Sequence, residues 1–229
     1  MLKIKSEGQC RFCKKLFSSN SIRKHLSSCE QRKKEQEIEL KQSSIYLLSA
    51  SKGPFWVYFE APANATLEDI DEFLRDLWLD CCGHLSQFII GNKRYISEFN
   101  EIEEFEEEES MDVSVEEVLK PSLSFSHEYD FGTTTVLGLS CIEVHQGMLF
   151  KKKIQILARN NLPNFVCSTC KKPATEICPQ CIWNGNALFC ARCAKKHGNK
   201  DDHNGEDSFL PVVNSPRMGM CGYTGPDED

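Results

Sequence analysis

Apolar and polar positions alternate in short runs between residues 44 and 158, which predicts a mixed α/β domain over residues 43–160. In one segment the apolar side chains instead recur at three- and four-residue steps, which predicts a helix over 67–81. Thr66 and Asp69 form its expected capping box, and Gly83 is placed to end it. We expect turns at 91–92, 132 and 146–147, a short helix over 113–119, and strands over 44–50, 54–61, 88–90, 93–96, 125–131, 133–144 and 148–157.

The regions on either side of this domain differ from it in composition. Residues 1–42 form a basic unit that ends in a charged helical stretch, residues 163–204 are rich in cysteine, and residues 205–229 form a tail rich in Gly and Pro. No apolar run reaches the roughly 18 residues that a membrane span needs, so no membrane partner is expected. The N-terminus lacks the apolar core of a secretion leader, and we expect the protein in the cytoplasm.

Charge is distributed unevenly along the chain. The net charge is −7, yet residues 1–41 carry eleven Lys or Arg against five Glu, a balance of +6 that leaves −13 for the remainder. Eleven acidic side chains lie between residues 98 and 117. This acidic stretch is either a solvated loop, which we favour, or a segment that folds back on the basic unit and competes with nucleic acid.

The thirteen cysteines carry the clearest chemical signal in the sequence. Their number is odd and a reducing compartment is expected, where clustered cysteines bind metal more often than they form disulfides. Nine of them fall into two groups with the spacing of metal ligands. The other four, Cys81, Cys82, Cys141 and Cys221, do not, and Cys81 and Cys82 are expected to fill the core at the end of their helix.

One group has the spacing of a zinc finger and consists of Cys10, Cys13, His25 and Cys29. The two cysteines of a tight turn would hold one side of a tetrahedron, while a His and a Cys on one helical face would hold the other. Phe17 and Ile22 occupy the positions of the two core residues of such a finger. The segment resembles a CCHC finger and predicts one zinc ion.

Basic side chains of this finger are candidate nucleic-acid contacts, namely Arg11, Lys14, Lys15, Arg23 and Lys24. They could meet the phosphates of DNA or RNA. One finger reads only about three base pairs, which is too few for useful specificity alone. The alternative is a solvated basic helix on a structural zinc unit.

The second group contains eight candidate ligands in four successive pairs: Cys167, Cys170, Cys178, Cys181, Cys190, Cys193, His197 and His203. Eight ligands suit two zinc ions, which brings the predicted total to three. Ligand order alone does not fix the pairing. The spacing resembles that of the cross-braced MYND and B-box modules.

By that resemblance, the first and third pairs would share one ion, and the second and fourth pairs the other. Pairing of neighbouring pairs along the chain is the competing arrangement. The gap between His197 and His203 is longer than in those modules, which leaves Cys221 as a substitute for His203 or as a free thiol.

Four segments of the middle region occur in an order known from another family. They are Phe-Trp-Val-Tyr-Phe at 55–59, Thr-Leu-Glu-Asp-Ile at 66–70, His-Leu-Ser-Gln-Phe at 84–88 and His-Glu-Tyr-Asp-Phe-Gly at 127–132. This order resembles the plasmid ORF-3-like family, the pRiA-type proteins associated with mobile elements. The resemblance implies an α+β fold with a mixed, largely antiparallel sheet and packed helices, and no established reaction. Residues 133–136 read Thr-Thr-Thr-Val where the family has Asp, Trp and His, so any role of those polar residues is lost.

A catalytic set is conceivable around His84, His127, Glu128 and Asp130, but we favour structural roles for them. No combination of nucleophile, base and orienting group is visible in the sequence. We expect Asp130 to cap a turn and His84 to bind a backbone carbonyl. No catalytic residue is therefore assigned.

These observations together predict a zinc-binding adaptor whose middle sheet and C-terminal module bind another protein. Trp183 and Leu188 are candidates for the binding surface, whereas Phe189 is expected in the core between the ions. The alternative function is a nucleic-acid-binding accessory of a mobile element or defence system that acts through the basic finger. A hydrolase or nuclease is the third and least supported hypothesis.

Overall fold

The computed structural model describes residues 4–36, 42–97, 108–148, 153–198 and 209–226. Within these ranges, ten strands form one large sheet and three short strands form a second. All neighbouring strands run antiparallel except β6 and β7, which are parallel. The expected α+β class, with a mixed and largely antiparallel sheet, is confirmed.

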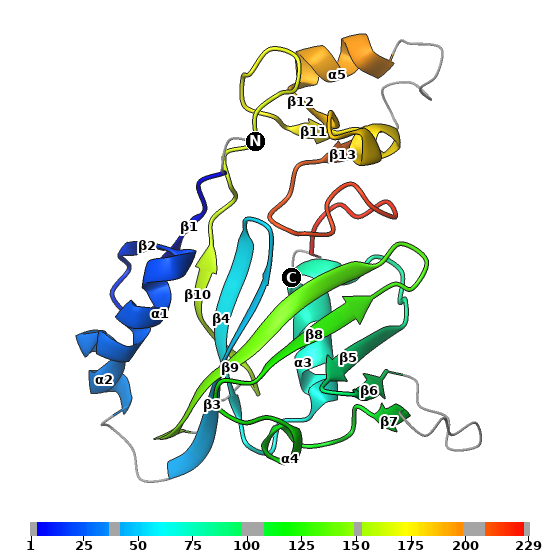
Figure 1. Cartoon of the computed structure of the whole chain (residues 1–229). Coiled ribbons are helices and arrows are strands. Elements are labelled where there is room, and N and C mark those ends of the chain that lie inside the picture. The colour runs from blue at the N-terminus through cyan, green and yellow to red at the C-terminus, as the bar shows by residue number, and fades with distance from the viewer. Residues whose placement is uncertain (1–3, 37–41, 98–107, 149–152, 199–208, 227–229) are drawn as a thin grey trace.

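The large sheet has the order β2-β1-β10-β4-β3-β9-β8-β5-β6-β7 (Figure 1). Its strands are β1 (Glu7–Cys10), β2 (Leu16–Ser18), β3 (Gln42–Lys52), β4 (Phe55–Pro62), β5 (Ser86–Ile90), β6 (Lys93–Ile96), β7 (Glu108–Ser110), β8 (Ser124–Tyr129), β9 (Thr135–Met148) and β10 (Gln155–Asn160). The small sheet has the order β12-β11-β13, with β11 (Glu176–Ile177), β12 (Leu188–Phe189) and β13 (Leu210–Pro211). The helical segments are α1 (Ser19–Ser28), α2 (Glu30–Gln36), α3 (Leu67–Leu74), the π-helical turn η1 (Arg75–Leu79), α4 (Val115–Val118), the 3-10 turn η2 (Pro179–Asn184) and α5 (Ala191–Gly198).

Strand β4 lies near the middle of the large sheet and is buried along its whole length. Because side chains alternate between the faces of a sheet, its two sets of side chains enter two different cores. Val57 and Phe59 belong to the core that α3 covers, whereas Trp56 and Tyr58 belong to a second core on the opposite face. Both faces of the sheet must therefore be covered at this strand.

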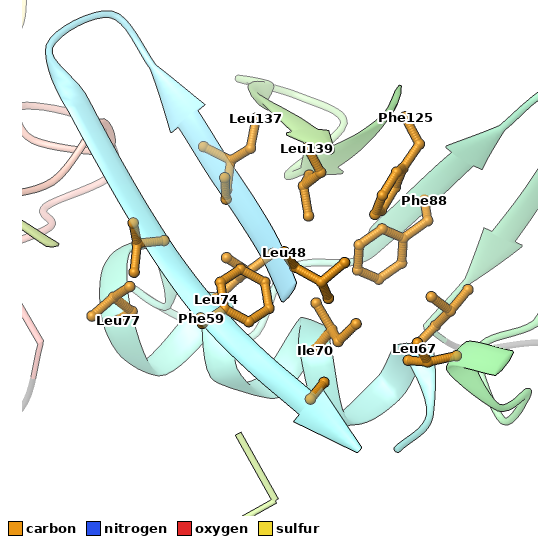
Figure 2. Close-up of a cluster of buried hydrophobic side chains, with 14 of the residues drawn as sticks. Leu48, Phe59, Leu67, Ile70, Leu74, Leu77, Phe88, Phe125, Leu137 and Leu139 are labelled. Carbon is orange, nitrogen blue, oxygen red and sulfur yellow. The ribbon is translucent and has the colours of Figure 1, made fainter. Parts of the chain in front are cut away.

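Helix α3 covers the first face. It begins at the predicted capping box, in which Thr66 Oγ1 accepts a hydrogen bond from the Asp69 N–H at 3.2 Å and Asp69 Oδ2 accepts one from the Thr66 N–H at 2.9 Å. Its apolar side chains point at those of the sheet (Figure 2), with Leu67, Ile70 and Leu74 opposite Leu48, Phe59, Phe88, Leu137 and Leu139.

The N-terminal segment covers the second face. Strand β1 pairs with β10, so the large sheet continues from the middle region into the segment that contains the predicted finger. Ile22 and Leu26 of α1 are fully buried and pack in one core with Trp56 and Tyr58 of β4. Figure 1 shows α1 and α2 beside the β1 and β10 end of the sheet.

A buried ion pair fastens α2 to the same strand. The Arg32 guanidinium donates to Glu60 Oε1 of β4 at 2.5 Å and to the Leu26 carbonyl at 2.9 Å. The side chains of Arg32 and Glu60 are only 5% and 3% exposed. The two charges stabilise each other because neither is solvated, and β9 adds Glu143 at 3.8 Å from Arg32 Nη1 and His145 at 3.4 Å from Glu60 Oε1.

The helix that begins at Leu67 ends earlier than expected. After the π-helical turn η1, Asp80 leaves the helix, and its Oδ1 accepts hydrogen bonds from the Gly83 N–H at 3.1 Å and from the Tyr129 hydroxyl at 3.0 Å. Gly83 has a φ of 70° and lies in the turn that follows, not at the helix end. This turn moves residues 81–84 out of the helix and into the polar surroundings of Asp80.

Two further expectations about the sheet are wrong. Residues 146 and 147 do not form a turn, because Gln146 and Gly147 lie in β9 opposite Ser44 and Ser43. The continuous pairing of β9 with β3 outweighs the local turn tendency of glycine, and the next strand, β10, begins only at Gln155. The acidic stretch is also not a loop throughout, since Glu108–Ser110 form β7; residues 98–107 lie outside the described residues.

Replacing Arg32 by Ala is expected to destabilise the fold by about 3–5 kcal/mol, because it leaves the Glu60 carboxylate buried with only the His145 ring, 3.4 Å away, in place of the guanidinium. Urea unfolding, followed by the fluorescence of the tryptophans, would measure the shift. Arg23, which is exposed on α1, provides the control: Arg23→Ala is expected to change stability by less than about 0.5 kcal/mol. Equal midpoints for the two variants would contradict a stabilising role for the buried pair.

Candidate metal centres

Four groups of cysteine and histidine side chains converge in the described part of the chain, and each has the donor atoms to hold a metal ion. In every group the donor atoms lie within 4.8 Å of one another. The first group consists of Cys10, Cys13, His25 and Cys29, as the sequence predicted. Within it, Cys13 Sγ lies 3.3 Å from His25 Nε2.

Short turns and one helix position these four donors. After β1 the chain turns back through Lys14, which has a φ of 61° and whose N–H donates to the Cys10 carbonyl at 2.9 Å. His25 projects from α1, and its ring stacks on Phe17 with the centroids 3.9 Å apart. The expected role of Phe17 and Ile22 in the core of the finger is therefore confirmed.

The C-terminal region contributes two groups. One consists of Cys167, Cys170, Cys190 and Cys193, and the other contains Cys178, Cys181 and His197. The first and third cysteine pairs thus share a centre, which is the cross-braced arrangement and not the consecutive one. His203, the remaining predicted ligand, lies outside the described residues.

The local geometry of the first finger recurs here. Lys171 follows Cys170 with a φ of 62°, and its N–H donates to the Cys167 carbonyl at 3.0 Å. His197 Nε2 lies 3.3 Å from Cys181 Sγ, and its ring stacks on Phe189 with the centroids 4.4 Å apart. Phe189 is buried, as expected for a residue between two metal centres.

The electrostatics of these groups favour metal ligation. Burial raises the pKa of the Cys167 thiol, but N–H donors of Cys170 and Cys190 outweigh it and lower this pKa to about 6. In the same group, burial and the neighbouring thiols raise the pKa of Cys193 to about 12. Clustered thiols cannot all ionise without a cation among them, whereas a bound metal ion would stabilise all four thiolates. Burial and then Lys15 lower the pKa of His25, which keeps its imidazole neutral, the form that binds metal.

The fourth group was not predicted. It consists of Cys81, Cys82, His84 and Cys221, and it corrects two expectations. Cys81 packs against the main core as expected, but Cys82 is exposed. Cys221 lies beside them and His84, so it neither replaces His203 in the C-terminal module nor stands alone. Cys141, the only cysteine outside the four groups, is fully buried in the main core.

A local sequence signal for this group existed. Three donors, Cys81, Cys82 and His84, lie within four consecutive residues directly after an apolar helix. His84 was expected to bind a backbone carbonyl, but its Nε2 instead lies 3.0 Å from Cys82 Sγ and 3.3 Å from Cys221 Sγ. The fourth donor lies 137 positions further along the chain, which no spacing rule could connect.

The residues considered as a catalytic set form structural networks. His127 is completely buried, and its Nε2 lies 2.6 Å from Asp71 Oδ1, while Arg75 Nε donates to Asp71 Oδ2 at 2.6 Å. Burial alone would raise the pKa of Asp71, but His127 and Arg75 outweigh it and hold that pKa below its usual value. A fully buried His127 has no access to a substrate.

Asp130 caps the turn after β8, as expected. Its Oδ1 accepts from the N–H groups of Gly132 at 3.0 Å and Thr133 at 3.2 Å, and its Oδ2 accepts from the buried Arg217. Glu128 Oε2 accepts from Gln87 Nε2 at 2.8 Å, a contact between neighbouring strands. These contacts fix the β8–β9 connection.

The basic residues that we considered for nucleic-acid contacts are all exposed: Arg11, Lys14, Lys15, Arg23 and Lys24. The described end of the acidic stretch does not contact them. Glu108 pairs with Arg94 and Glu109 with Lys93, both on β6. Figure 1 places β6 and β7 at the far end of the sheet from α1.

The largest exposed apolar side chain of the C-terminal module is Trp183, at 74% exposure. It lies on η2, the turn that follows Cys178 and contains Cys181. Leu188, the other candidate surface residue, is only partly buried and packs at the edge of the main core. No helix in the described ranges is long and apolar enough to cross a membrane.

No family model matches the chain, and no curated protein matches it. One solved structure, of a protein of unknown function from Methanosarcina mazei Go1, is similar with a TM-score of 0.39 and 14% identity. The similarity covers 47% of this chain and 64% of that one.

Proposed function

We propose that this protein is a zinc-binding adaptor whose C-terminal module binds another protein and whose metal ions have structural roles. The observation that carries the proposal is the exposed indole of Trp183 on a module ordered around two donor groups. Tryptophan is enriched among the residues that dominate binding at protein interfaces. An indole that is mostly solvent-exposed contributes little to the core and is available to a partner, with an apolar ring and an N–H donor.

Zinc is the metal that suits these donors. Thiolate and imidazole ligands in sets of four are typical of structural zinc sites, and a complete set leaves no open position for a substrate. We assign one ion to the group of Cys10 and one to that of Cys167. A third ion is assigned to Cys178, Cys181 and His197, with His203 as the remaining ligand.

The thiol groups also bear on the compartment. Thirteen free cysteines in one chain require a reducing environment to remain available as ligands, which supports the cytoplasm. The plasmid ORF-3-like and MYND-like relationships remain part of the proposal. The largely antiparallel sheet and the cross-braced grouping of the C-terminal donors are consistent with them and name no reaction.

Purified full-length protein is expected to contain at least three zinc ions per chain by elemental analysis. Removing them with a chelator is expected to abolish amide protection in residues 5–36 and 165–198 while β3, β4 and α3 stay protected. The reason is that the main core contains no ligand of the three assigned ions, whereas Cys10 and Cys29 are part of the core beneath α1 and Cys167 and Cys178 are part of the core of the C-terminal module. Hydrogen exchange with and without chelator would measure this. A zinc content of one ion or less, or a uniform loss of protection, would contradict the assignment.

Replacing Trp183 by Ala is expected to weaken partner binding by at least about thirtyfold, the effect of losing an interface residue worth about 2 kcal/mol. The partner would be captured with the full chain from its native host, and its affinity measured for each variant. Phe131, half exposed in the β8–β9 connection, offers a matched control, since Phe131→Ala removes an aromatic ring outside the module. Equal loss in both variants, or no loss in Trp183→Ala, would contradict the proposed surface.

A second candidate function, nucleic-acid binding through the N-terminal finger, has one observation in its favour. The five basic side chains named above are exposed, and the described acidic residues pair elsewhere. Both functions are compatible with the same structural ions. Because the apolar face of α1 is buried on the sheet, a nucleic acid would have to contact its opposite, basic face.

If the finger binds nucleic acid, Arg23→Ala/Lys24→Ala is expected to lower the slope of log K against log salt by about 1.8 for duplex DNA, roughly 0.9 for each lost phosphate contact. Gel-shift titrations at several salt concentrations would measure the slope. Lys33→Ala/Lys34→Ala removes the same charge from exposed positions of α2 and serves as the control. Identical slopes for the two variants would show that the finger makes no specific phosphate contacts, and an absence of binding would leave the adaptor function alone.

A further inference from the structure

The fourth donor group joins two parts of the chain that are far apart in sequence. Cys81, Cys82 and His84 lie in the turn after η1, and Cys221 lies in the C-terminal tail. Cys82 Sγ is 3.7 Å from Cys81 Sγ and 3.6 Å from Cys221 Sγ, while His84 Nε2 lies 3.0–3.3 Å from the Sγ atoms of Cys82 and Cys221. All four donors therefore face one point.

These separations match the edges of a coordination tetrahedron. Zinc–sulfur bonds of about 2.3 Å and zinc–nitrogen bonds of about 2.0 Å place two sulfurs about 3.8 Å apart and a sulfur and a nitrogen about 3.5 Å apart. A disulfide would instead require sulfurs about 2.0 Å apart. The predicted centres have the same spacing, with Cys170 and Cys190 Sγ 3.6 Å apart and Cys13 Sγ 3.3 Å from His25 Nε2.

The side chains around the group support ligands of this kind. Arg217 is completely buried, and its Nη2 donates to Cys81 Sγ at 3.7 Å and to the Asp130 carboxylate. The guanidinium is therefore shared between the Cys81 sulfur and the Asp130 carboxylate, whose Oδ2 also lies 3.6 Å from His84 Nε2. The ring of His84 is held edge-on against Tyr129, with centroids 5.7 Å apart. A hydrogen bond to a ligand atom, such as that from Arg217 to Cys81 Sγ, orients the ligand of a metal site.

The backbone conformation at Cys221 also indicates that this residue is held in place by specific contacts. Cys221 has a φ of 48°, in the left-handed region, between Met220 and Gly222. A side chain other than glycine in this region costs roughly 1 kcal/mol or more, so something must hold the residue there. In the two predicted centres the residue in this region is the lysine that follows the second cysteine, Lys14 or Lys171, whereas here it is the donor itself.

The rest of the tail follows a fixed path from the C-terminal module to this group. Strand β13 pairs with β11 in the module, and Asn214 then exchanges hydrogen bonds with Asn160 at 2.6 and 2.8 Å. Ser215 Oγ donates to the Trp78 carbonyl at 2.6 Å. Arg217 and Cys221 complete the path on the middle domain.

We propose that Cys81, Cys82, His84 and Cys221 form a fourth zinc site that fastens the C-terminal tail to the middle domain. Three thiolates and an imidazole select zinc among the common divalent ions of a reducing compartment. Four protein donors close the coordination sphere, so the ion is structural even though a cavity of about 450 Å³ adjoins Cys81 and Cys82. The site is additional to the three ions assigned above and does not depend on them or on the adaptor function.

The zinc content of single-site variants of the full chain tests the proposal, measured by elemental analysis and native mass spectrometry. Cys221→Ser is expected to lose one zinc ion relative to the parent protein. Cys141→Ala, which removes the only cysteine outside the four groups, is expected to lose none. Hydrogen exchange is expected to quicken in Cys221→Ser at the amides of Met218, Met220 and Tyr223, which bond within the tail.

His84 supplies a second pair of variants that remains informative if Cys221→Ser does not fold. His84→Cys restores a fourth donor and is expected to keep the full zinc content, whereas His84→Ala is expected to lose one ion. An unchanged zinc content in both Cys221→Ser and His84→Ala would overturn the proposal, as would a disulfide between any two of the three cysteines in the purified protein. None of these variants alters a ligand of the other three centres, so their failure would leave the proposed function intact.

Discussion

The burial of β4 on both faces is the constraint on which the rest of the architecture depends. A strand with apolar side chains on both faces needs a cover on each, and the chain supplies two very different ones. On one face lies α3, an amphipathic helix that the middle region itself provides. On the other lies an N-terminal segment too small to form a core of its own, held by Ile22, Leu26 and the Arg32–Glu60 pair. The finger is thus a structural component of the sheet, whatever else it binds.

This arrangement suggests that the role of a metal ion would be to stabilise the small segments at the two ends of the chain. Small segments bury too little apolar surface to offset the conformational entropy that they lose on folding, and metal bonds supply the difference. The candidate centres of the finger and of the C-terminal module share the same local geometry. In each, a lysine in the left-handed region closes the turn between two cysteines, and a phenylalanine stacks on the histidine ligand. The recurrence of both details indicates that backbone and ring contacts, as well as ligand identity, define these centres.

Features that depend on local spacing could be predicted from the sequence, whereas features that depend on contacts between distant parts of the chain could not. Ligands on one turn or one helical face are separated by a characteristic number of residues. This spacing was enough to identify Cys10, Cys13, His25 and Cys29 without a structure. The same holds for the Thr66 capping box and for most strands, whose apolar patterns are local. Cys221 meets His84 only because the tail crosses the molecule, and Gly147 is a strand residue only because β3 pairs with β9 as far as Met148. Pairings over such distances have no signature in one sequence.

The tail shows how the separate parts become one molecule. It leaves the small sheet at β13, places the buried Arg217 beside Asp130, and ends the described chain near Cys221 on the middle domain. Each of these contacts restricts the position of the C-terminal module relative to the large sheet (Figure 1). A surface on that module, such as the one around Trp183, is therefore presented in a direction set by the middle domain. For the proposed adaptor function, such rigid presentation would lower the entropy that an interface residue loses on binding and so favour recognition through a single exposed aromatic side chain.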